Sequence, residues 1–497
     1  MTDKLTLDEL ESHLWESANI LRGSIDSSDY KNYIFGLLFL KRVSDVFQEN
    51  REHIREEYGE QFVDDPDFYT ESHVFVPERA RWDYIKEQTQ DIGADINKAF
   101  EKLEQENTVL EGVLTPTDFN DKERLPDHVL EELIQHYSDI QLGNDDLEDP
   151  DILGRAYEYL IRQFADDAGK KGGEFYTPRG VVRLLVKILD PEENMRVYDP
   201  CCGSGGMLIY SAEHIRNNGT DMGSISLFGQ ERNLNTWAIC KMNMFLHELF
   251  DAKIERGDTM RDPQFTHEGE VMQFDRVIAN PMWNQKEWSK EYLQEANPYG
   301  RFSYGFPPKN SGDWAWIQHM LASANREGKV GVVLDNGALF RSRSEGKIRK
   351  KALQDDLVEA VIALPENLFY NTSSPGCILI FNKNKPAART NKVIFIYGEE
   401  DYEEGSNQNY LREEHIDKIV EAYQDYENVE KYCRVVDMEE IDRNDYNLNV
   451  PRYVDTTEPE EPVDIDEVLD NLNQLEKERD EIEEEMNGYL QELGYDG

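Results

Sequence analysis

Hydrophobic residues recur with two different spacings along this chain. Up to about residue 160 they recur every three to four positions, as at Leu7, Leu10 and Leu14, and the stretch 30–47 is apolar at most positions. This spacing predicts helices, and the helix over 30–47 should be buried on most sides. We therefore expect residues 1–150 to form an all-helical N-terminal domain whose apolar residues are core.

From about residue 150, short apolar runs alternate with stretches of helical spacing. This alternation predicts an α/β fold over residues 151–455, a doubly wound and mostly parallel sheet with helices on both faces. Strands are expected at 196–199, 226–231, 274–279, 329–334, 357–364, 376–381 and 393–397, with another ending near 256, and helices at 152–165, 179–189, 235–250 and 314–324.

The C-terminal segment 456–497 begins with a Pro- and acid-rich stretch typical of a linker. Two sets of mostly apolar positions then alternate at 3.5-residue spacing with charged outer positions, which predicts a coiled-coil helix. Such a short, polar helix is not stable alone, so either a partner helix is implied or the helix folds back on its own chain. The seam positions are Ile465, Leu472, Arg479, Met486 and Leu493 in one set, and Val468, Leu475, Ile482 and Tyr489 in the other.

Residues 196–208 predict a strand that ends at Asp199, a glycine-containing turn, and a helix entered near Met207. Glycines let the backbone approach a bound molecule where a Cβ would clash. A dinucleotide-binding turn would need Gly where Leu208 stands, and no P-loop Gly-Lys-Ser/Thr follows. Alone, this turn fits a structural strand–helix connection as well as a cofactor site.

A second predicted strand, 274–279, runs directly into Asn280-Pro281-Met282-Trp283. In an open parallel sheet both strand ends lie at the carboxyl edge, where ligands bind. One end would then hold a cofactor, and the other would form a polar and aromatic binding site for a flat substrate that carries an amine.

Composition limits the class of protein. Hydrophobic residues make up 39% of the chain, enough for a large core, and no apolar run reaches membrane-spanning length. The N-terminus has no signal-peptide pattern. Five cysteines include no C-x-x-C pair, which argues against structural zinc or disulfides and fits a reducing cytoplasm. We expect Cys201 and Cys202 to be small core residues rather than metal ligands.

The charge is unusual, with 102 acidic against 53 basic residues and a net charge of −49. A DNA-binding protein is expected to be basic. Disorder does not fit the persistent apolar spacing, and a DNA mimic does not fit acids scattered along the whole chain. Adaptation to a salt-rich cytoplasm fits better, because at ~1 M salt the screening length is ~3 Å and an acidic surface repels DNA weakly. DNA contact would then come from local basic spots or from a partner.

Three motifs together resemble the modification (M) subunit of Type I restriction–modification systems, an adenine-N6 DNA methyltransferase. They are Gly173 to Pro178, Asp199 to Gly206, and Asn280 to Trp283, in that order. The resemblance covers nearly the whole chain. It implies S-adenosylmethionine as cofactor, and it implies cofactor-binding roles for Glu174, Tyr176, Thr177, Pro178, Asp199, Pro200, Gly203, Ser204, Gly205, Gly206, Glu231 and Asp258.

For catalysis the resemblance points to Asn280, Pro281 and Trp283. Hydrogen bonds from an adenine amine to the Asn280 side-chain oxygen and the Pro281 carbonyl would make its nitrogen more nucleophilic, and Trp283 would stack on the flipped base. No metal is needed. Met282 departs from the family, which usually has a second proline at that position.

The resemblance also implies partners. These are duplex DNA, a specificity (S) subunit bound through the N-terminal domain and the C-terminal helix, and a restriction–translocation (R) subunit, because this chain has no P-loop and no nuclease motif. The alternatives are a methyltransferase acting on protein or RNA, and a non-catalytic cofactor-binding assembly subunit or scaffold.

Two further stretches have open roles. Residues 284–308 are aromatic and polar without periodicity, with basic points that include Arg301, and predict a functional loop beside the site, although core packing explains some of the aromatics. The basic run from Arg341 to Lys351 is either a solvated helix face or a set of phosphate contacts.

Overall fold

The N-terminal region is helical, as its apolar spacing predicts. The computed structural model describes residues 4–25, 29–69, 74–148, 152–168, 177–219, 224–369, 372–405, 408–457 and 465–493. Helices in the N-terminal region are α1 (Leu7–Leu21), α2 (Tyr30–Glu57), α3 (Trp82–Ile85), α4 (Ile92–Glu106), α5 (Asp127–Ser138) and α6 (Ile152–Ala168).

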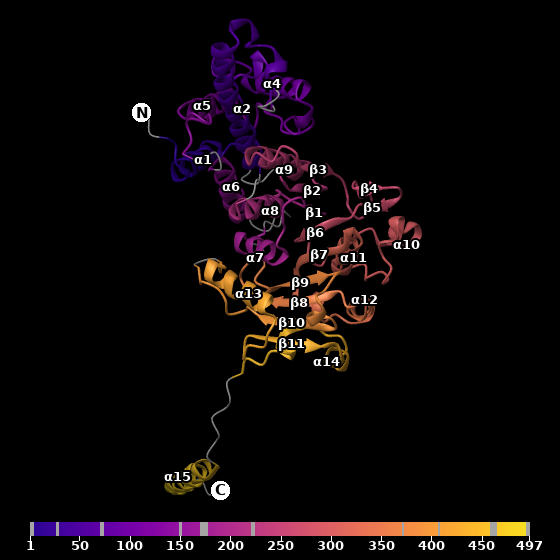
Figure 1. The fold of residues 1–497 in the computed structure, drawn as a ribbon. Coiled ribbons are helices and arrows are strands. Elements are labelled where there is room, and N and C mark those ends of the chain that lie inside the picture. Colours follow the sequence, from indigo (N-terminus) through magenta and orange to yellow (C-terminus); the bar gives the residue numbers. More distant parts are fainter. Residues whose placement is uncertain are drawn as a thin grey trace. The chain divides into compact units, whose positions relative to one another are not determined.

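Helix α2 is the centre of this region, and the others pack around its first half (Figure 1). Its residues from Tyr33 to Ser44 are all buried, which confirms the predicted burial, and the helix continues beyond residue 47 to Glu57. A Cβ at Gly36 would lie 3.3 Å from the rings of Phe100 and Phe119, so alanine there would require these rings to shift by a few tenths of an ångström.

Within the described residues the central sheet has nine strands in the order β11-β10-β8-β9-β7-β6-β1-β2-β3. All neighbouring pairs are parallel except those made by β9 and by β11 with β10, so the mostly parallel sheet is confirmed. The strands are β1 (Arg196–Asp199), β2 (Ser226–Glu231), β3 (Lys253–Arg256), β6 (Phe274–Ala279), β7 (Ala324–Asp335), β8 (Val358–Ala363), β9 (Gly376–Asn382), β10 (Lys392–Tyr397) and β11 (Cys433–Asp437).

Helices cover both faces of the sheet (Figure 1). Alternate residues of a strand belong to opposite cores: on β1, Val197 belongs to the core that includes residues of α7, α8 and α13, whereas Tyr198 belongs to the core that includes residues of α11 and α12. The helices are α7 (Arg179–Leu189), α8 (Gly206–Asn217), α9 (Leu234–Leu246), α10 (Lys290–Ala296), α11 (Asp313–Ser323), α12 (Arg343–Gln354), α13 (Glu413–Asp425) and α14 (Met438–Arg443).

Some predicted elements needed correction. Helix α9 ends at Leu246 and not at residue 250, because Glu248 takes a left-handed backbone (φ 59°) and the Leu249 N–H turns back to the Met244 carbonyl at 2.9 Å. Edge strand β11 and the short hairpin of β4 (Thr266–His267) and β5 (Glu270–Val271) were not predicted, since these strands are only two to five residues long.

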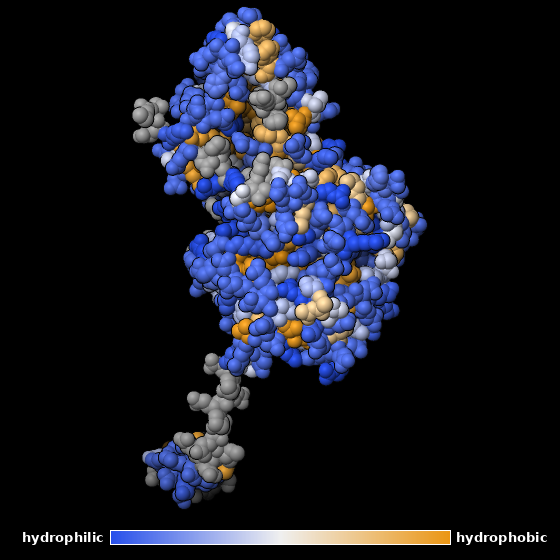
Figure 2. Space-filling model, viewed as in Figure 1, coloured by the Kyte–Doolittle hydropathy of each residue, from blue (hydrophilic) through white to orange (hydrophobic). Residues whose placement is uncertain are grey.

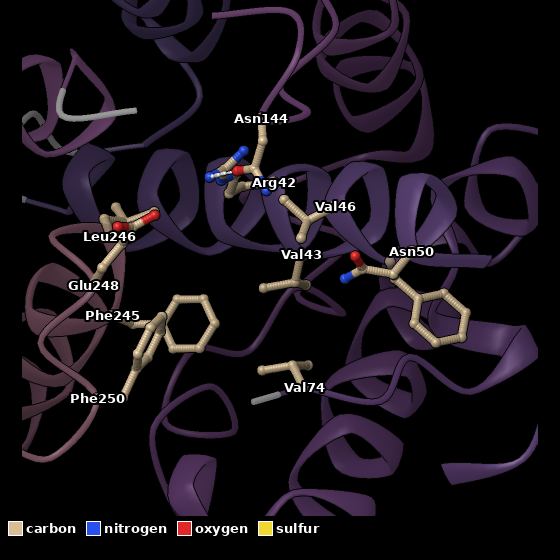
Figure 3. Close-up of a pocket in the computed structure, with 11 residues that line it drawn as sticks. Arg42, Val43, Val46, Asn50, Val74, Asn144, Phe245, Leu246, Glu248 and Phe250 are labelled. Carbon is tan, nitrogen blue, oxygen red and sulfur yellow. Dashed lines mark hydrogen bonds between the residues drawn. The ribbon is translucent and has the colours of Figure 1, made fainter. Parts of the chain in front are cut away.

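The N-terminal helices meet the sheet region at a cavity of about 320 Å³ between α2 and the segment after α9 (Figure 3). Val43, Val46 and Phe250 contribute to its apolar lining. At its rim Arg42 donates to the Leu142 carbonyl and to Asn144 Oδ1, both at 2.6 Å. No predicted cofactor-binding or catalytic residue that the structure describes lines this cavity.

The chain forms two compact units, residues 1–454 and 455–497. The predicted boundary near residue 150 lies inside the first unit, so the division into 1–150, 151–455 and 456–497 remains a prediction from the sequence. The second unit contains α15 (Ile465–Glu492), the predicted C-terminal helix. Its described seam residues are exposed, for example Leu475 (62%) and Ile482 (65%).

The surface is mostly hydrophilic on the face drawn in Figure 2, in keeping with the net charge of −49. Among the described residues, no helix is both long and apolar enough to span a membrane.

Candidate active site

The predicted site residues follow neighbouring strands at one edge of the sheet. Strands β6, β1, β2 and β3 are adjacent and parallel, with Tyr198 paired to Val277 and Asp199 paired to Gly229. Their carboxyl ends therefore meet, and Asp199, Glu231, Asp258 and Asn280 lie at or just after these ends. The sequence predicts that the turn after Asp199 and the segment Asn280–Trp283 lie at the same edge of the sheet, and in the structure they do.

The turn after β1 depends on glycine. Gly205 has φ 88°, a backbone conformation that favours glycine, and a Cβ there would also lie 2.3 Å from the Met244 methyl group and displace it. At Gly203 (φ 55°) and at Gly206 an added Cβ would meet nothing within 4 Å, so one side of the turn is open. The Asn243 amide fixes the turn from α9 by donating to the Ser204 carbonyl at 3.0 Å.

Asp199 is a buried carboxyl group at the end of β1, and its Oδ1 accepts from the Cys201 N–H at 3.0 Å. Burial raises the pKa of Asp199 to about 7; the negative charge of Glu231 acts in the same direction, and the hydrogen bond from Cys201 opposes it. Asp199 therefore changes charge near neutral pH, unlike an ordinary surface aspartate.

Glu231 and Asp258 order the neighbouring loops. The Glu231 carboxylate accepts from the Gly203 N–H at 3.2 Å and from the Asn233 N–H at 2.7 Å, so it connects the β1 turn to the start of α9. Asp258 Oδ1 accepts from the Met260 N–H at 3.1 Å. Both carboxylates are partly exposed at the same edge.

A closed ring of hydrogen bonds surrounds the end of β1. Thr259 Oγ1 donates to the Pro200 carbonyl at 2.6 Å, and Arg301 donates to the carbonyls of Thr259 (2.9 Å) and Met260 (2.6 Å). Arg301 Nη1 also bonds His319 Nδ1 at 3.0 Å, and His319 Nε2 bonds the Tyr198 hydroxyl at 3.2 Å. The ring thereby joins β1, the loop after β3, α11 and the loop 284–312.

The charge states in this ring follow from burial. Burial, with the Arg301 charge acting in the same direction, lowers the pKa of His319 well below its usual value, so the imidazole is neutral. Its Nδ1 accepts from Arg301, so Nε2 carries the proton and donates to Tyr198. Burial also lowers the pKa of Arg301 to about 10. Arg301 is 2% exposed, so this basic point of the loop 284–308 is a buried structural residue.

Asn280, at the end of β6, is half-buried and held on both sides of its amide. Its Nδ2 donates to Thr177 Oγ1 at 3.0 Å, and its Oδ1 accepts from Trp283 Nε1 at 2.9 Å. Trp283 Nε1 also lies 3.2 Å from the Val333 carbonyl on β7. Met282 points outward and is 48% exposed.

Thr177 lies just before α7 and contacts a distant part of the chain. The predicted helix start is correct, since α7 begins at Arg179, but Pro178 is the residue before it and no side chain caps it. The Thr177 hydroxyl accepts from Asn280 instead, which brings two of the sequence motifs into contact. Glu174 and Tyr176 lie outside the described residues.

Arg341 ties the segment after Asn280 to three elements. It donates to Asp313 (2.7 Å), to Asp335 (2.7 Å) and to the Asn284 side-chain oxygen, and Asp313 accepts from the Asn284 N–H at 2.8 Å. It also lies 3.4 Å from Glu345. The sequence predicts either a solvated helix face or phosphate contacts for this basic run. Arg341 fits neither prediction, because its guanidinium binds carboxylates of the same chain.

The other basic residues between Arg343 and Lys351 are of two kinds, one buried and the rest exposed. Arg349 is 2% exposed and donates to the Tyr446 carbonyl at 2.7 Å, so it too is structural. Arg343, Lys347, Lys350 and Lys351 are exposed on α12 and remain the candidates for phosphate contact.

The loop 284–308 is partly core. Trp288 and Phe302 are buried in a small cluster with Met260 and Trp316, and Phe306 packs against that cluster. Tyr292, by contrast, is 44% exposed. Core packing thus explains several of the aromatics whose role the sequence left open.

The cysteines behave as core residues. Cys202 and Cys240 are buried free thiols with their sulfurs 3.9 Å apart, and Cys201 packs at the border of two clusters. Across the described ranges, no group of three His, Cys, Asp or Glu side chains is placed to hold a metal ion.

Comparison with known proteins covers nearly the whole chain. Residues 148–462 match the family N-6 DNA Methylase, and residues 10–137 match the HsdM N-terminal domain. The Type I restriction enzyme MjaVIII methylase subunit of Methanocaldococcus jannaschii is 38% identical over 99% of this chain and 86% of that protein. The Type I restriction enzyme HindI methylase subunit of Haemophilus influenzae is 34% identical over 85% of this chain and 100% of that protein.

A solved structure has the same fold. The type I restriction-modification system methyltransferase subunit from Streptococcus thermophilus superimposes with a TM-score of 0.80 and 29% identity, over 91% of this chain and 100% of that one.

Proposed function

This chain belongs to the N-6 DNA methylase family, and from that premise we propose that it transfers a methyl group from S-adenosylmethionine to the N6 amine of a flipped adenine in duplex DNA. It would do so as the modification subunit of a Type I restriction–modification complex. The observation that carries the proposal is the Asn280 amide, held on both sides at the carboxyl edge beside the glycine turn that follows β1.

The residues around the turn fit the chemistry of S-adenosylmethionine. Asp199 offers a buried carboxyl group for the ammonium of the methionine moiety, and Glu231 offers carboxylate oxygens for ribose hydroxyls. The open side of the turn at Gly203 and Gly206 leaves room for the ligand. Asp258, on the loop fixed by Thr259 and Arg301, would lie toward the adenine of the cofactor. When bound, S-adenosylmethionine supplies an electrophilic methyl group with a good leaving group.

The protein's contribution to the reaction is alignment and activation of the amine. The lone pair of an exocyclic amine is delocalised into the ring, so the amine is a poor nucleophile. Acceptance of its two N–H bonds by Asn280 Oδ1 and the Pro281 carbonyl favours a pyramidal, more nucleophilic nitrogen. The half-buried Trp283 ring would stack on the flipped base, and holding both reactants in line supplies much of the rate.

We assign the partner surface for the S subunit to α15, with the N-terminal helices as a second contact. The flanks of the α15 seam carry Glu476, Glu478, Glu483 and Glu485, and its centre carries Arg479. A second copy of this helix would place glutamates against glutamates and arginine against arginine. A helix with an apolar seam, basic flanks and an acid facing Arg479 fits instead.

The test is modification-sensitive sequencing of DNA from cells that express this chain with its S subunit. N6-methyladenine at one defined motif is expected, with loss of at least a hundredfold in Asn280→Ala. Asn218→Ala, an exposed asparagine at the end of α8, is the matched control and should methylate normally.

Cofactor binding by calorimetry separates the alternatives. Binding of S-adenosylmethionine without any modified base, at both low and molar salt, would contradict the methyltransferase proposal and leave a cofactor-binding assembly subunit. Methylation of RNA or protein in place of DNA would identify the other enzyme class.

A further inference from the structure

Trp283 donates its indole N–H to the residue proposed to bind the adenine amine. The distance from Nε1 to Asn280 Oδ1 is 2.9 Å, and the two residues are three positions apart along the chain. Trp283 therefore has a contact that a purely stacking aromatic would lack.

The indole N–H decides which way the amide of Asn280 points. An amide presents an oxygen on one side and an NH₂ on the other, and the two have nearly the same shape. The indole N–H can only donate, so the atom that faces it must be the amide oxygen. Thr177 Oγ1, 3.0 Å from Nδ2 on the other side, accepts from the NH₂ group.

This orientation matters for the chemical step. The amide oxygen can accept from an adenine N–H, which concentrates electron density on the amine nitrogen. The NH₂ group would instead donate to that nitrogen and occupy the lone pair that must attack the methyl group. Since a carbonyl oxygen has two acceptor sites, Oδ1 bound to Trp283 keeps one for the substrate.

The indole is itself fixed by three neighbours. Its Nε1 also lies 3.2 Å from the Val333 carbonyl on β7, and its ring meets Phe369 edge-on with centroids 4.6 Å apart. A Cβ at Gly376 would lie 3.0 Å from the Trp283 ring and 2.6 Å from that of Phe369, so the glycine leaves room for both rings. Such packing limits rotation of the indole away from Asn280.

We propose that Trp283 is a positioning residue whose N–H sets the Asn280 amide with its oxygen on the side where the base binds, an inference that rests on the proposed function. Phenylalanine or tyrosine at this position could stack on a base but could not donate this bond. Trp283 therefore orients the Asn280 amide through its N–H, in addition to any stacking of its ring on the base.

The experiment uses the full chain in complex with its S subunit and a duplex that contains the recognition site. Trp283→Phe keeps an aromatic ring and removes the N–H. We expect kcat to fall about tenfold, with the KM values for DNA and for S-adenosylmethionine changed less than twofold. Fluorescence of 2-aminopurine at the target position should report unchanged base flipping.

Trp82→Phe is the matched control. The Trp82 Nε1 donates to Ser138 Oγ at 2.9 Å among the buried N-terminal helices, so the same substitution removes a comparable bond away from Asn280. Its kcat should stay at the wild-type value. A Trp283→Phe enzyme with wild-type kcat, or with only a raised KM for DNA, overturns the orienting role.

A second measurement does not depend on turnover. In protein labelled with ¹⁵N-tryptophan, the resonance lost in Trp283→Phe identifies the Trp283 indole, and Asn280→Leu should shift it upfield by removing the acceptor. An unshifted indole signal overturns the contact. Absent wild-type methylation would overturn the proposed function itself, and the indole shift would still report whether the contact exists.

Discussion

Asp199 is a carboxyl group that titrates near neutral pH. Burial raises its pKa to about 7, so it is about one-tenth ionised at pH 6 and about three-quarters ionised at pH 7.5. If it binds the ammonium of S-adenosylmethionine, only its ionised form does so well. We expect affinity measured by calorimetry to rise about eightfold between these pH values. Asp199→Asn should bind more weakly without that rise, and an equally steep rise in the variant would contradict the assignment.

The same group affects stability with the opposite sign. The pKa of Asp199 is higher in the folded than in the unfolded chain, so the folded state holds the proton longer. Its contribution to folding is therefore full below about pH 4 and is lost as pH rises to about 7. Urea unfolding should show the wild type losing stability relative to Asp199→Asn over that range, and a constant difference would contradict the raised pKa.

Residue patterns predicted where the candidate site residues lie but not their contacts. The places of Asp199, Asn280 and Trp283 could be predicted because they end or directly follow an apolar strand. The bond between Thr177 and Asn280 could not, because it joins residues 103 positions apart and no local pattern encodes such a contact. The burial of Arg301 could not be predicted for the same reason, since its carbonyl partners lie on another loop.

At the scale of elements, Arg341 connects the segment after Asn280 to α11, β7 and α12. It faces Asp313, whose side chain is fully buried, and Glu345, whose side chain is 2% exposed. Arg341→Met would leave these carboxylates without their cation, and we expect a loss of about 3–5 kcal/mol in the free energy of unfolding. Burial raises the pKa of Glu345 and the Arg341 charge opposes this, so the loss should shrink as the pH falls and Glu345 takes up a proton.

Arg443→Met is the control for that measurement. Arg443 is exposed on α14 and makes one hydrogen bond, of 3.3 Å, to the Glu439 carbonyl within its own helix. Its replacement should change the free energy of unfolding by less than about 0.5 kcal/mol. Equal losses in the two variants would show that Arg341 does not anchor the loop through its buried acids.

Apolar spacing predicted the elements best where they are long and buried. Strand β6 and helix α7 have the expected limits because continuous apolar residues and a proline define them. Strand β11 pairs antiparallel at the sheet edge, and its five residues include Arg434 and Asp437, so its apolar run is too short to mark a strand. The order of strands across the sheet likewise depends on packing between distant segments.

At the scale of the whole molecule, the net charge of −49 makes a prediction about salt. If this surface is adapted to a salt-rich cytoplasm, repulsion among its acids destabilises the fold at low ionic strength. We expect the thermal midpoint to rise by about 5 °C or more between 0.1 and 2 M KCl, because the screening length falls from ~10 Å to below ~3 Å. A flat or falling midpoint would contradict salt adaptation and require another reason for the charge.

Helix α15 is affected differently by the same salt. The glutamates that flank its seam are exposed, so molar salt screens their repulsion and weakens their power to reject a wrong helix. Arg479 acts by another route, since pairing would strip water from its charge unless an acid faced it, and that penalty does not fade with ionic strength. If α15 binds a partner helix as proposed, Arg479 would thus keep that binding selective at molar salt, where exposed surface charges no longer discriminate between helices.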